Sequence, residues 1–293
     1  MGAEREFSTL YPEGLAPGRL LRSLDLAARK GLGQNFLAGK SALRQVLLAL
    51  DPQPDDVVVE IGAGLGTLTG YLVAEAGRVL AVELDDHLAG HLEGQFAGAG
   101  NVQVVRGDIL ALHPSDLDLA SGSRYKAVGN LPYYITSAAL RHVLGWVPTP
   151  EVLVVMVQEE VARRIVARPG DLSLLALMVQ LAGAAELVAR VPAGAFVPPP
   201  KVNSAVVRIV PHSQPRVTPA EEDQLFRLAR AAFQQKRKTL ANSLAGAVPL
   251  SKSALGRLLE SVGLSPSTRA QQVSLEQWIA LTAATQEVGD ARS

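Results

Sequence analysis

The stretch VVVEIGAGLGTLT, residues 57–69, indicates the fold class of this chain. Residues 57–61 are apolar and mostly β-branched, apart from Glu60, which is typical of a buried strand. A helical pattern follows after three glycines at alternate positions, Gly62, Gly64 and Gly66. Such a turn lets the backbone approach a ligand closely, and the helix start offers free N–H groups. The stretch therefore predicts an α/β fold with a nucleotide-type site.

The same strand–helix rhythm continues along the chain. Further strand-like runs lie at residues 79–84, 102–106, 126–129 and 152–157, and helical patterns lie at 41–50, 68–76 and 86–96. Continuous apolar strands separated by helices predict a doubly wound parallel sheet covered on both faces. Two more runs, 185–191 and 202–210, are expected to close the sheet, one of them antiparallel. We therefore predict a mostly parallel seven-stranded, Rossmann-like domain over residues 1–215, with 1–20 as an irregular arm.

The composition changes after Pro211. Thr218 and Glu221 form a capping box with Pro219 at the first helical position, and a helical pattern runs on to about residue 244. Ser265-Pro266 and Ser274-x-x-Gln277 resemble further helix starts. The sequence thus predicts a small all-helical domain over residues 216–293.

The bulk composition narrows the class of protein. The chain has 293 residues, 48% of them hydrophobic, and a formal net charge of zero. It has no cysteine, which excludes disulfides, thiolate zinc sites and cysteine nucleophiles, and its five histidines show no HExxH spacing, so no metal site is expected. No apolar run reaches the ~18 residues of a membrane span, and the start MGAEREFSTL lacks the apolar core of a secretory signal. A cytoplasmic monomer without a membrane partner is expected.

Polar residues end the strands that follow the glycine turn. Glu83, Asp108 and Asn130 close the second, third and fourth strands. Ligands of open α/β sheets bind beyond the carboxyl ends of the strands, where Glu83 can accept hydrogen bonds from ribose hydroxyls and Asp108 from an adenine amino group. Thr67 stands where the dinucleotide fingerprint requires glycine. This argues against NAD and favours a related nucleotide-like ligand.

These motifs together resemble S-adenosylmethionine-dependent methyltransferases that modify exocyclic amino groups. More narrowly, the chain resembles the KsgA/RsmA family of small-subunit rRNA adenine dimethyltransferases over about residues 20–285. The matching stretches are KGLGQNFL (30–37), VVEIGAGLGTLT (58–69), VELD (82–85), GDIL (107–110), GNLPYYI (129–135), MVQEEVARRI (156–165), FVPPPKVNSAVVRI (196–209) and AFQQKRKTLANSL (232–244).

The resemblance implies S-adenosylmethionine as cofactor. It also implies cofactor contacts at six matched positions, Asn35, Leu37, Gly62, Glu83, Asp108 and Asn130. In these roles Asn35 and Leu37 would close over the cofactor, Gly62 would approach its amino-acid portion, and Asn130 would touch both cofactor and target. Without the other motifs, GQNFL (33–37) would be an ordinary glycine turn that packs its apolar residues.

The segment GNLPYY, residues 129–134, is the expected catalytic element. The adenine amino group is a poor nucleophile, so the side-chain oxygen of Asn130 and the carbonyl of Leu131 are expected to accept its two N–H groups and aim its lone pair. Pro132 makes the segment rigid and donates no competing N–H. Tyr133 is expected to stack on the base, and Tyr134 is assigned to packing.

An amino group inside a nucleic acid is reached only on an unstacked or flipped base. Phe196, placed by the stiff Pro198-Pro199-Pro200 loop, is predicted as the second stacking face, with the alternative that it fills the core at a strand entry. Lys201, which follows this loop, is predicted to contact RNA phosphates. The same is predicted for a basic cluster formed by Arg230, Lys236, Arg237 and Lys238. A solvated helix face is the alternative for the cluster, and the resemblance favours RNA.

The predicted function is dimethylation of two adjacent adenines near the 3′ end of 16S rRNA during small-subunit biogenesis. Two alternatives stay open. One is an Erm-type large-subunit rRNA adenine methyltransferase, which shares the cofactor motifs and the Asn-x-Pro-Tyr segment. The other is a ribosome-assembly factor whose binding role outweighs catalysis.

Overall fold

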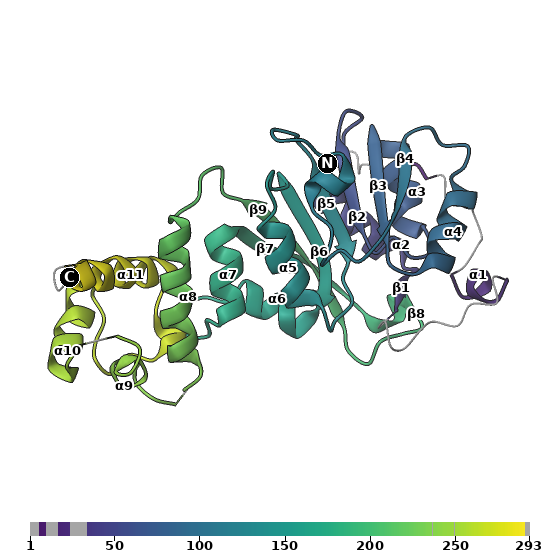
Figure 1. The fold of residues 1–293 in the computed structure, drawn as a ribbon. Helices are drawn as coiled ribbons and strands as arrows, with labels where there is room; N and C mark the ends of the chain where they lie inside the picture. Colours follow the sequence, from purple (N-terminus) through teal and green to yellow (C-terminus); the bar gives the residue numbers. More distant parts are fainter. Residues whose placement is uncertain (1–5, 10–16, 24–33, 236, 249, 291–293) are drawn as a thin grey trace, which may run out of the picture. The chain divides into compact units, whose positions relative to one another are not determined.

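The computed structural model describes residues 6–9, 17–23, 34–235, 237–248 and 250–290. The chain divides into two compact units, residues 1–162 with 184–211, and residues 163–183 with 212–293. The first is built on a β-sheet, whereas helices make up the second (Figure 1). The predicted α/β fold with a helical C-terminal part is therefore confirmed.

The sheet of the first unit has seven strands among the described residues, in the order β4-β3-β2-β5-β6-β9-β7. They are β2 (Val57–Ile61), β3 (Arg78–Glu83), β4 (Val102–Arg106), β5 (Lys126–Asn130), β6 (Val152–Gln158), β7 (Gly183–Val191) and β9 (Ser204–Pro211). The pairs from β4 to β6 are parallel, whereas β9 runs antiparallel to β6. This confirms the mostly parallel sheet and its antiparallel closing strand. Because β2 lies between β3 and β5, the strand order reverses there, which is where such sheets bind ligands.

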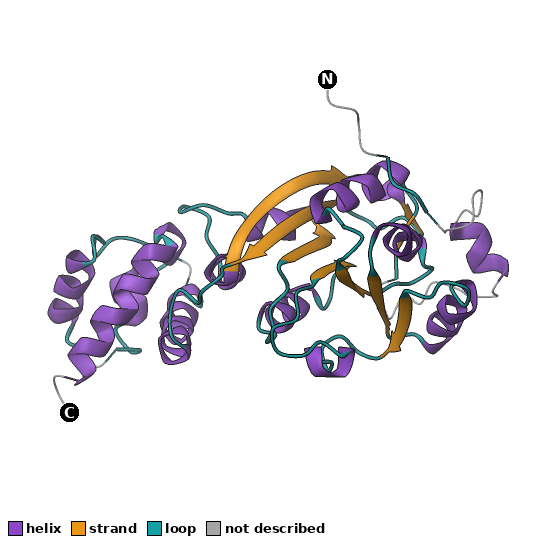
Figure 2. Cartoon of the chain, turned by 90° about the horizontal axis from the view of Figure 1, so that it is seen from above, coloured by secondary structure: helices purple, strands orange, loops and turns teal. Residues whose placement is uncertain are grey.

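Helices lie on both faces of the sheet (Figure 2). The described helices of the first unit are α1 (Pro17–Ser23), α2 (Lys40–Leu50), α3 (Thr67–Glu75), α4 (Asp86–Gln95), η2 (Pro114–Leu117), α5 (Thr136–Leu144), η3 (Ala193–Ala195) and the start of α6 (Glu159–Ile165). The last residues of α6, from Arg163 on, belong to the second unit. Leu47 of α2 and Leu72 of α3 pack with Val58 and Val128 in one core cluster. Since side chains alternate along a strand, Val59 points to the opposite face. Burial on both faces explains why these strands are continuously apolar.

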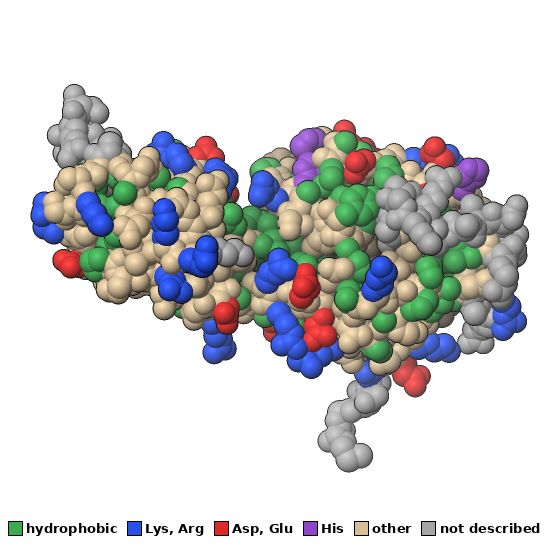
Figure 3. Space-filling view, turned by 90° about the horizontal axis from the view of Figure 1, so that it is seen from below, with side chains coloured by type: hydrophobic (Ala, Val, Ile, Leu, Met, Phe, Trp, Pro, Cys, Tyr) green, Lys and Arg blue, Asp and Glu red, His purple; other side chains and the backbone are tan. Residues whose placement is uncertain are grey.

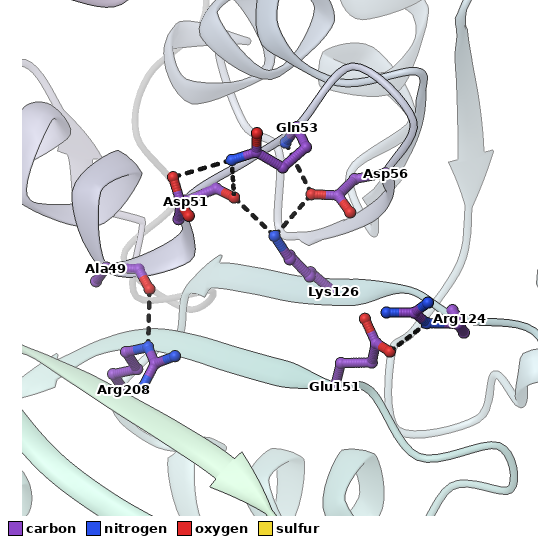
Figure 4. Close-up of polar contacts among 8 residues, drawn as sticks. All are labelled: Ala49, Asp51, Gln53, Asp56, Arg124, Lys126, Glu151 and Arg208. Atoms are coloured by element: carbon purple, nitrogen blue, oxygen red, sulfur yellow. Dashed lines mark hydrogen bonds and ion pairs between the residues drawn. The ribbon is translucent and has the colours of Figure 1, made fainter. Parts of the chain in front are cut away.

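Two cations hold the C-terminal end of α2 to the sheet (Figure 4). Arg208 of β9 donates from Nε to the carbonyl of Ala49 at 3.0 Å, and Lys126 of β5 donates from Nζ to the carbonyl of Asp51 at 2.6 Å. Lys126 also forms an ion pair with Asp56 at 2.7 Å. Cations here satisfy helix carbonyls and complement the helix dipole. Because Lys126 begins its strand, these contacts lie at the edge opposite to the strand ends that carry the predicted site.

The second unit has a core of its own. Its helices α7 (Leu174–Ala182), α8 (Pro219–Phe233), α9 (Leu240–Leu244), α10 (Lys252–Ser261) and α11 (Leu275–Asp290) share buried residues that include Leu177, Leu225 and Trp278. Residues 163–183 join this unit, although the prediction placed everything before 216 in the first domain. The reason is long-range: apolar α7 enters the helical core, and the carbonyl of Gln271 accepts hydrogen bonds from the backbone N–H groups of Gly170 and Leu172.

Several helices of the second unit begin directly after an N-capping residue. Thr218 caps α8 as predicted, and Ser274 accepts from the N–H of Gln277 at 3.2 Å at the start of α11. The single helix predicted to residue 244 is wrong: α8 ends at Phe233, and Thr239 caps the separate helix α9. No helix begins at Ser265-Pro266, and the next element is the short η4 (Ala270–Gln272), which precedes α11. Among the described residues, no helix is both long and apolar enough to cross a membrane.

Candidate active site

The glycine turn after β2 has the backbone that its sequence suggests. The backbone φ values of Gly62, Gly64 and Gly66 are +73°, +60° and +76°. Residues that carry a side chain rarely adopt such values. A Cβ on Gly66 would lie 2.9 Å from Leu92 and from Phe96, so this glycine serves packing. A Cβ on Gly62 would find only the carbonyl of Asn130, at 3.9 Å. The space beside Gly62 is therefore open to a ligand.

A cavity of about 270 Å³ lies at the carboxyl ends of β2, β3, β4 and β5. It brings together eight of the predicted site residues, namely Asn35, Gly62, Glu83, Asp108, Asn130, Leu131, Pro132 and Tyr133. It is also lined by Gln34, Phe36, Leu84 and Ile109, which are not among the predicted site residues. An apolar residue directly after a strand-end acid, as in Glu83-Leu84 and Asp108-Ile109, is the sequence signal that would have found two of them.

Glu83 is fixed at the bottom of this cavity, with only 7% of its surface exposed. Its Oε2 accepts a hydrogen bond from the N–H of Gly64 at 2.8 Å, and its Oε1 accepts from the N–H of Asp85 at 2.9 Å. Burial raises the pKa of Glu83, and these two hydrogen bonds oppose the rise. Each carboxylate oxygen has more than one acceptor position, so Glu83 retains capacity for two neighbouring hydroxyls.

Asp108 is exposed at the rim of the cavity. One of its oxygens, Oδ1, accepts from the N–H of Leu110 at 2.9 Å, which fixes the loop after β4. A fixed carboxylate can accept a hydrogen bond from an amino group, as expected for this position.

Asn130 ends β5 close to the glycine turn. The approach depends on Gly129, because a Cβ there would lie 2.7 Å from the carbonyl of Ile61. The side chain of Asn130 donates from Nδ2 to the carbonyl of Asn35 at 2.7 Å. A carbonyl can only accept, so this bond sets the orientation of the amide and leaves Oδ1 as an acceptor.

The residues after Asn130 form a braced turn. The N–H of Leu131 donates to the carbonyl of Met156 at 3.1 Å, and the carbonyl of Pro132 accepts from the N–H of Ile135 at 3.1 Å. Tyr133 forms a hydrogen bond of 2.9 Å between its hydroxyl and Ser204 Oγ. No hydrogen bond to the Leu131 carbonyl is seen within the described part of the chain. The turn thus holds a second acceptor beside Asn130.

Tyr134 differs from the prediction. The sequence predicts that its ring packs inside the protein, but 61% of the residue is exposed, and it lines the cavity. The preceding Tyr133 is partly buried and anchored, so the two rings have different environments. The repeat Tyr-Tyr gave no local signal for which ring turns outward.

Phe196 and Leu37 meet in a short antiparallel pair of strands. β1 (Phe36–Leu37) pairs with β8 (Phe196–Val197), and Leu37 lies opposite Phe196. Both residues are buried in the core, Leu37 with 7% and Phe196 with 2% of its surface exposed, and neither lines the cavity of about 270 Å³. This geometry favours the alternative in which Phe196 fills the core at a strand entry. Leu37 instead lines a smaller cavity beneath the glycine turn.

Replacing Phe196 by leucine separates these two roles. If Phe196 is a core residue, the smaller side chain leaves a cavity and costs on the order of 1–3 kcal/mol of unfolding free energy, whereas a stacking face loses its aromatic ring. For a core role we expect this loss of stability in urea and an unchanged KM for the RNA substrate. A markedly raised KM with unchanged stability would restore the stacking role.

A buried acid lies behind the glycine turn. Glu60 of β2 is 2% exposed and, with Gly62, Gly64 and Asn130, lines the smaller cavity of about 40 Å³. Within the described residues its Oε2 has no hydrogen-bond partner. Burial raises the pKa of Glu60 to about 8, and the nearby carboxylate of Glu83 adds to this rise. Glu60 is therefore mostly protonated at neutral pH.

The predicted RNA-binding residues stay predictions. Arg230 of α8, Arg237 and Lys238 are exposed in the second unit, and Lys201 is exposed in the first. Lys236 lies outside the described residues. Figure 3 shows basic side chains spread over one face of the second unit. Exposed cations of this kind suit contact with phosphates.

A family model described as "Ribosomal RNA adenine dimethylase" matches residues 26–287 of the chain. Two similar relatives are both called "Ribosomal RNA small subunit methyltransferase A". The relative from Dehalococcoides mccartyi is 45% identical over 259 residues, covering 88% of this chain and 89% of its own length. The relative from Moorella thermoacetica is 40% identical over 281 residues, covering 91% and 96%.

Two solved structures are similar over most of the chain. The 23S rRNA methyltransferase ErmE is 28% identical with a TM-score of 0.69, covering 86% of this chain and 100% of that one. A dimethyladenosine transferase from Plasmodium falciparum is 24% identical with a TM-score of 0.74, covering 87% and 98%. At 24% identity this second likeness shows the shared fold alone.

Proposed function

We propose that this chain, which belongs to the ribosomal RNA adenine dimethylase family, dimethylates two adjacent adenines near the 3′ end of 16S rRNA. The proposed methyl donor is S-adenosylmethionine. The observation that carries the proposal is the amide of Asn130. Its Nδ2 is held by the carbonyl of Asn35 at 2.7 Å, which leaves its Oδ1 as an acceptor in a cavity that also contains Glu83 and Asp108.

The cavity fits an adenosine-containing cofactor. Gly62 leaves open space where a side chain would stand, which suits the amino-acid portion. The buried carboxylate of Glu83 suits the ribose hydroxyls, and the exposed Asp108 suits the amino group of the cofactor's adenine. S-adenosylmethionine, when bound, supplies the methyl group of its sulfonium. Asn35 would close the cavity through the backbone that already holds Asn130.

Asn130 and Leu131 prepare the target nitrogen. The lone pair of an adenine amino group is delocalised into the ring, which makes this nitrogen a weak nucleophile. Hydrogen bonds from its two N–H groups to Asn130 Oδ1 and the Leu131 carbonyl would hold it toward tetrahedral geometry. The same two acceptors would stabilise the positive charge that develops on the nitrogen during transfer. Fixed acceptors need no reorganisation, so positioning supplies much of the rate.

The described residues of the cavity include no histidine. None is needed, because the nitrogen becomes acidic once it carries the methyl group and can then release its proton to solvent. Pro132 keeps the turn rigid, and Tyr133 offers its ring to the base while Ser204 holds its hydroxyl. We propose no catalytic base for this site.

The substrate assignment rests on the relatives. Those called small subunit methyltransferase A are 45% and 40% identical to this chain, whereas the 23S enzyme ErmE is 28% identical. We propose that Lys201, Arg230, Arg237 and Lys238, with Lys236, contact the RNA backbone. We propose that the protein acts as a monomer. Ribosomal RNA as substrate fits the cytoplasm.

Methylation of purified subunits tests the proposal. Unmethylated small and large subunits are incubated separately with labelled S-adenosylmethionine, and the RNA is digested to nucleosides. We expect two dimethyladenosines per small subunit and background label in the large subunit. Label confined to large subunits would assign the chain to the Erm-type activity, and label in neither would refute the proposed substrate.

A further inference from the structure

Tyr134 is an unusual surface residue. Among the described residues, the exposed large apolar side chains are Leu48, Leu84, Tyr134, Val147 and Val202. Tyr134 is the aromatic member of this set, and it lines the cavity that holds Asn130. Solvent exposure of a large ring at a ligand cavity leaves a stacking face without a protein partner. This exposed ring therefore suggests stacking on a planar group outside the cavity.

The backbone around Tyr134 is held in place. Its two neighbours in the chain are fixed, because the hydroxyl of Tyr133 bonds to Ser204 Oγ at 2.9 Å and the N–H of Ile135 donates to Pro132 at 3.1 Å. Thr136 Oγ1 adds a second hydrogen bond to the same carbonyl at 3.3 Å. The ring of Tyr134 is thus presented from a rigid turn, which lowers the entropy lost on binding.

We propose that Tyr134 is the stacking platform for the base next to the target adenine, at the mouth of the cavity. The inference rests on the proposed function, in which one adenine enters the cavity beside Tyr133. When that base leaves its stack, its neighbour loses a stacking partner. An exposed aromatic ring replaces the lost partner and thereby lowers the cost of extracting the target.

The chemistry of two adjacent targets favours stacking over hydrogen bonding at this position. After the first adenine is dimethylated, its amino group has no N–H left to donate. A site that recognised the neighbour through that amino group would reject it in the second round. Stacking on a ring uses only the face of the base, so Tyr134 accepts the neighbour whether or not it is methylated. One platform therefore serves both rounds of modification.

Steady-state methylation of small subunits by three variants tests this role. Tyr134→Ala and Tyr134→Leu remove the aromatic face, whereas Tyr134→Phe keeps it. Stacking of one base on an aromatic ring is worth about 1–3 kcal/mol, so the KM for subunits should rise roughly 5- to 150-fold in the Ala and Leu variants. The Phe variant should stay near wild type. Calorimetry should give an unchanged Kd for S-adenosylmethionine in all three.

The matched control is Leu48→Ala, because Leu48 is also exposed but does not line the cavity. Its KM should equal that of the wild type. A wild-type KM in Tyr134→Ala, or in Tyr134→Leu, would overturn the platform, as would a parallel loss of cofactor affinity. If the wild-type protein methylates no small subunits, the proposed function fails instead. The two failures are therefore distinguishable.

Discussion

Replacing Asn130 by alanine is expected to lower the rate of methyl transfer by about 10²–10³-fold, the loss typical of removing one preorganised polar group at a reacting centre. The variant loses the Oδ1 acceptor and also the hydrogen bond from Nδ2 to Asn35. We expect kcat to fall far more than the affinity for S-adenosylmethionine, because Gly62, Glu83 and Asp108 remain. The measurement is kcat on small subunits, with the cofactor Kd from calorimetry.

The control for Asn130 is another asparagine with a structural amide. Asn101 donates from Nδ2 to the carbonyls of Val73 and Ala76, both at 2.9 Å, and does not line the cavity. Asn101→Ala should lower the free energy of unfolding by about 1–3 kcal/mol and leave kcat unchanged. Near-wild-type turnover in Asn130→Ala would remove Asn130 from the mechanism.

Much of the site follows from the sequence because it depends on local rules. Strands β2 and β4 begin and end at the predicted residues, because runs of β-branched residues strongly favour strands. Parallel strands then bring their carboxyl ends to one edge, so Gly62, Glu83, Asp108 and Asn130 meet in one cavity. Here periodicity and topology were sufficient.

The remaining features depend on partners far away in the chain. Phe36 and Phe196 belong to strands of two residues whose pairing no periodic pattern announces. Helix α7 joins the second unit because of packing with α8 and α11, which its own sequence does not encode. The exposure of Tyr134 depends on how the turn leaves β5. Such facts come from long-range packing, which overrides local preference.

The energetic cost of burying Glu60 could not be predicted from the sequence either. This residue occupies a central strand position whose neighbours are apolar, and only the structure shows that its Oε2 lacks a partner among the described residues. Burial raises the pKa of Glu60 to about 8 and outweighs hydrogen bonding by Thr69, which acts to lower it. An acid with a raised pKa in the folded state binds a proton that the unfolded chain releases.

The sign of the effect on stability follows from this difference. The ordinary pKa of a glutamate is 4.5, so between pH 4.5 and about 8 the folded state holds more protons than the unfolded state. The contribution of Glu60 to the free energy of unfolding therefore falls as the pH rises through this window. The total change is on the order of 5 kcal/mol at most.

Glu60→Gln is accordingly expected to stabilise the protein above neutral pH by several kcal/mol, because glutamine keeps the shape but cannot ionise. Urea unfolding at pH 5, 7 and 8.5 measures the effect. The wild type should lose stability over this range, and the variant should lose much less. Glu222→Gln, at an exposed position on α8, is the control and should keep the wild-type slope. A wild-type protein equally stable at all three pH values would show that Glu60 is ionised in the folded state, held by a partner outside the described contacts.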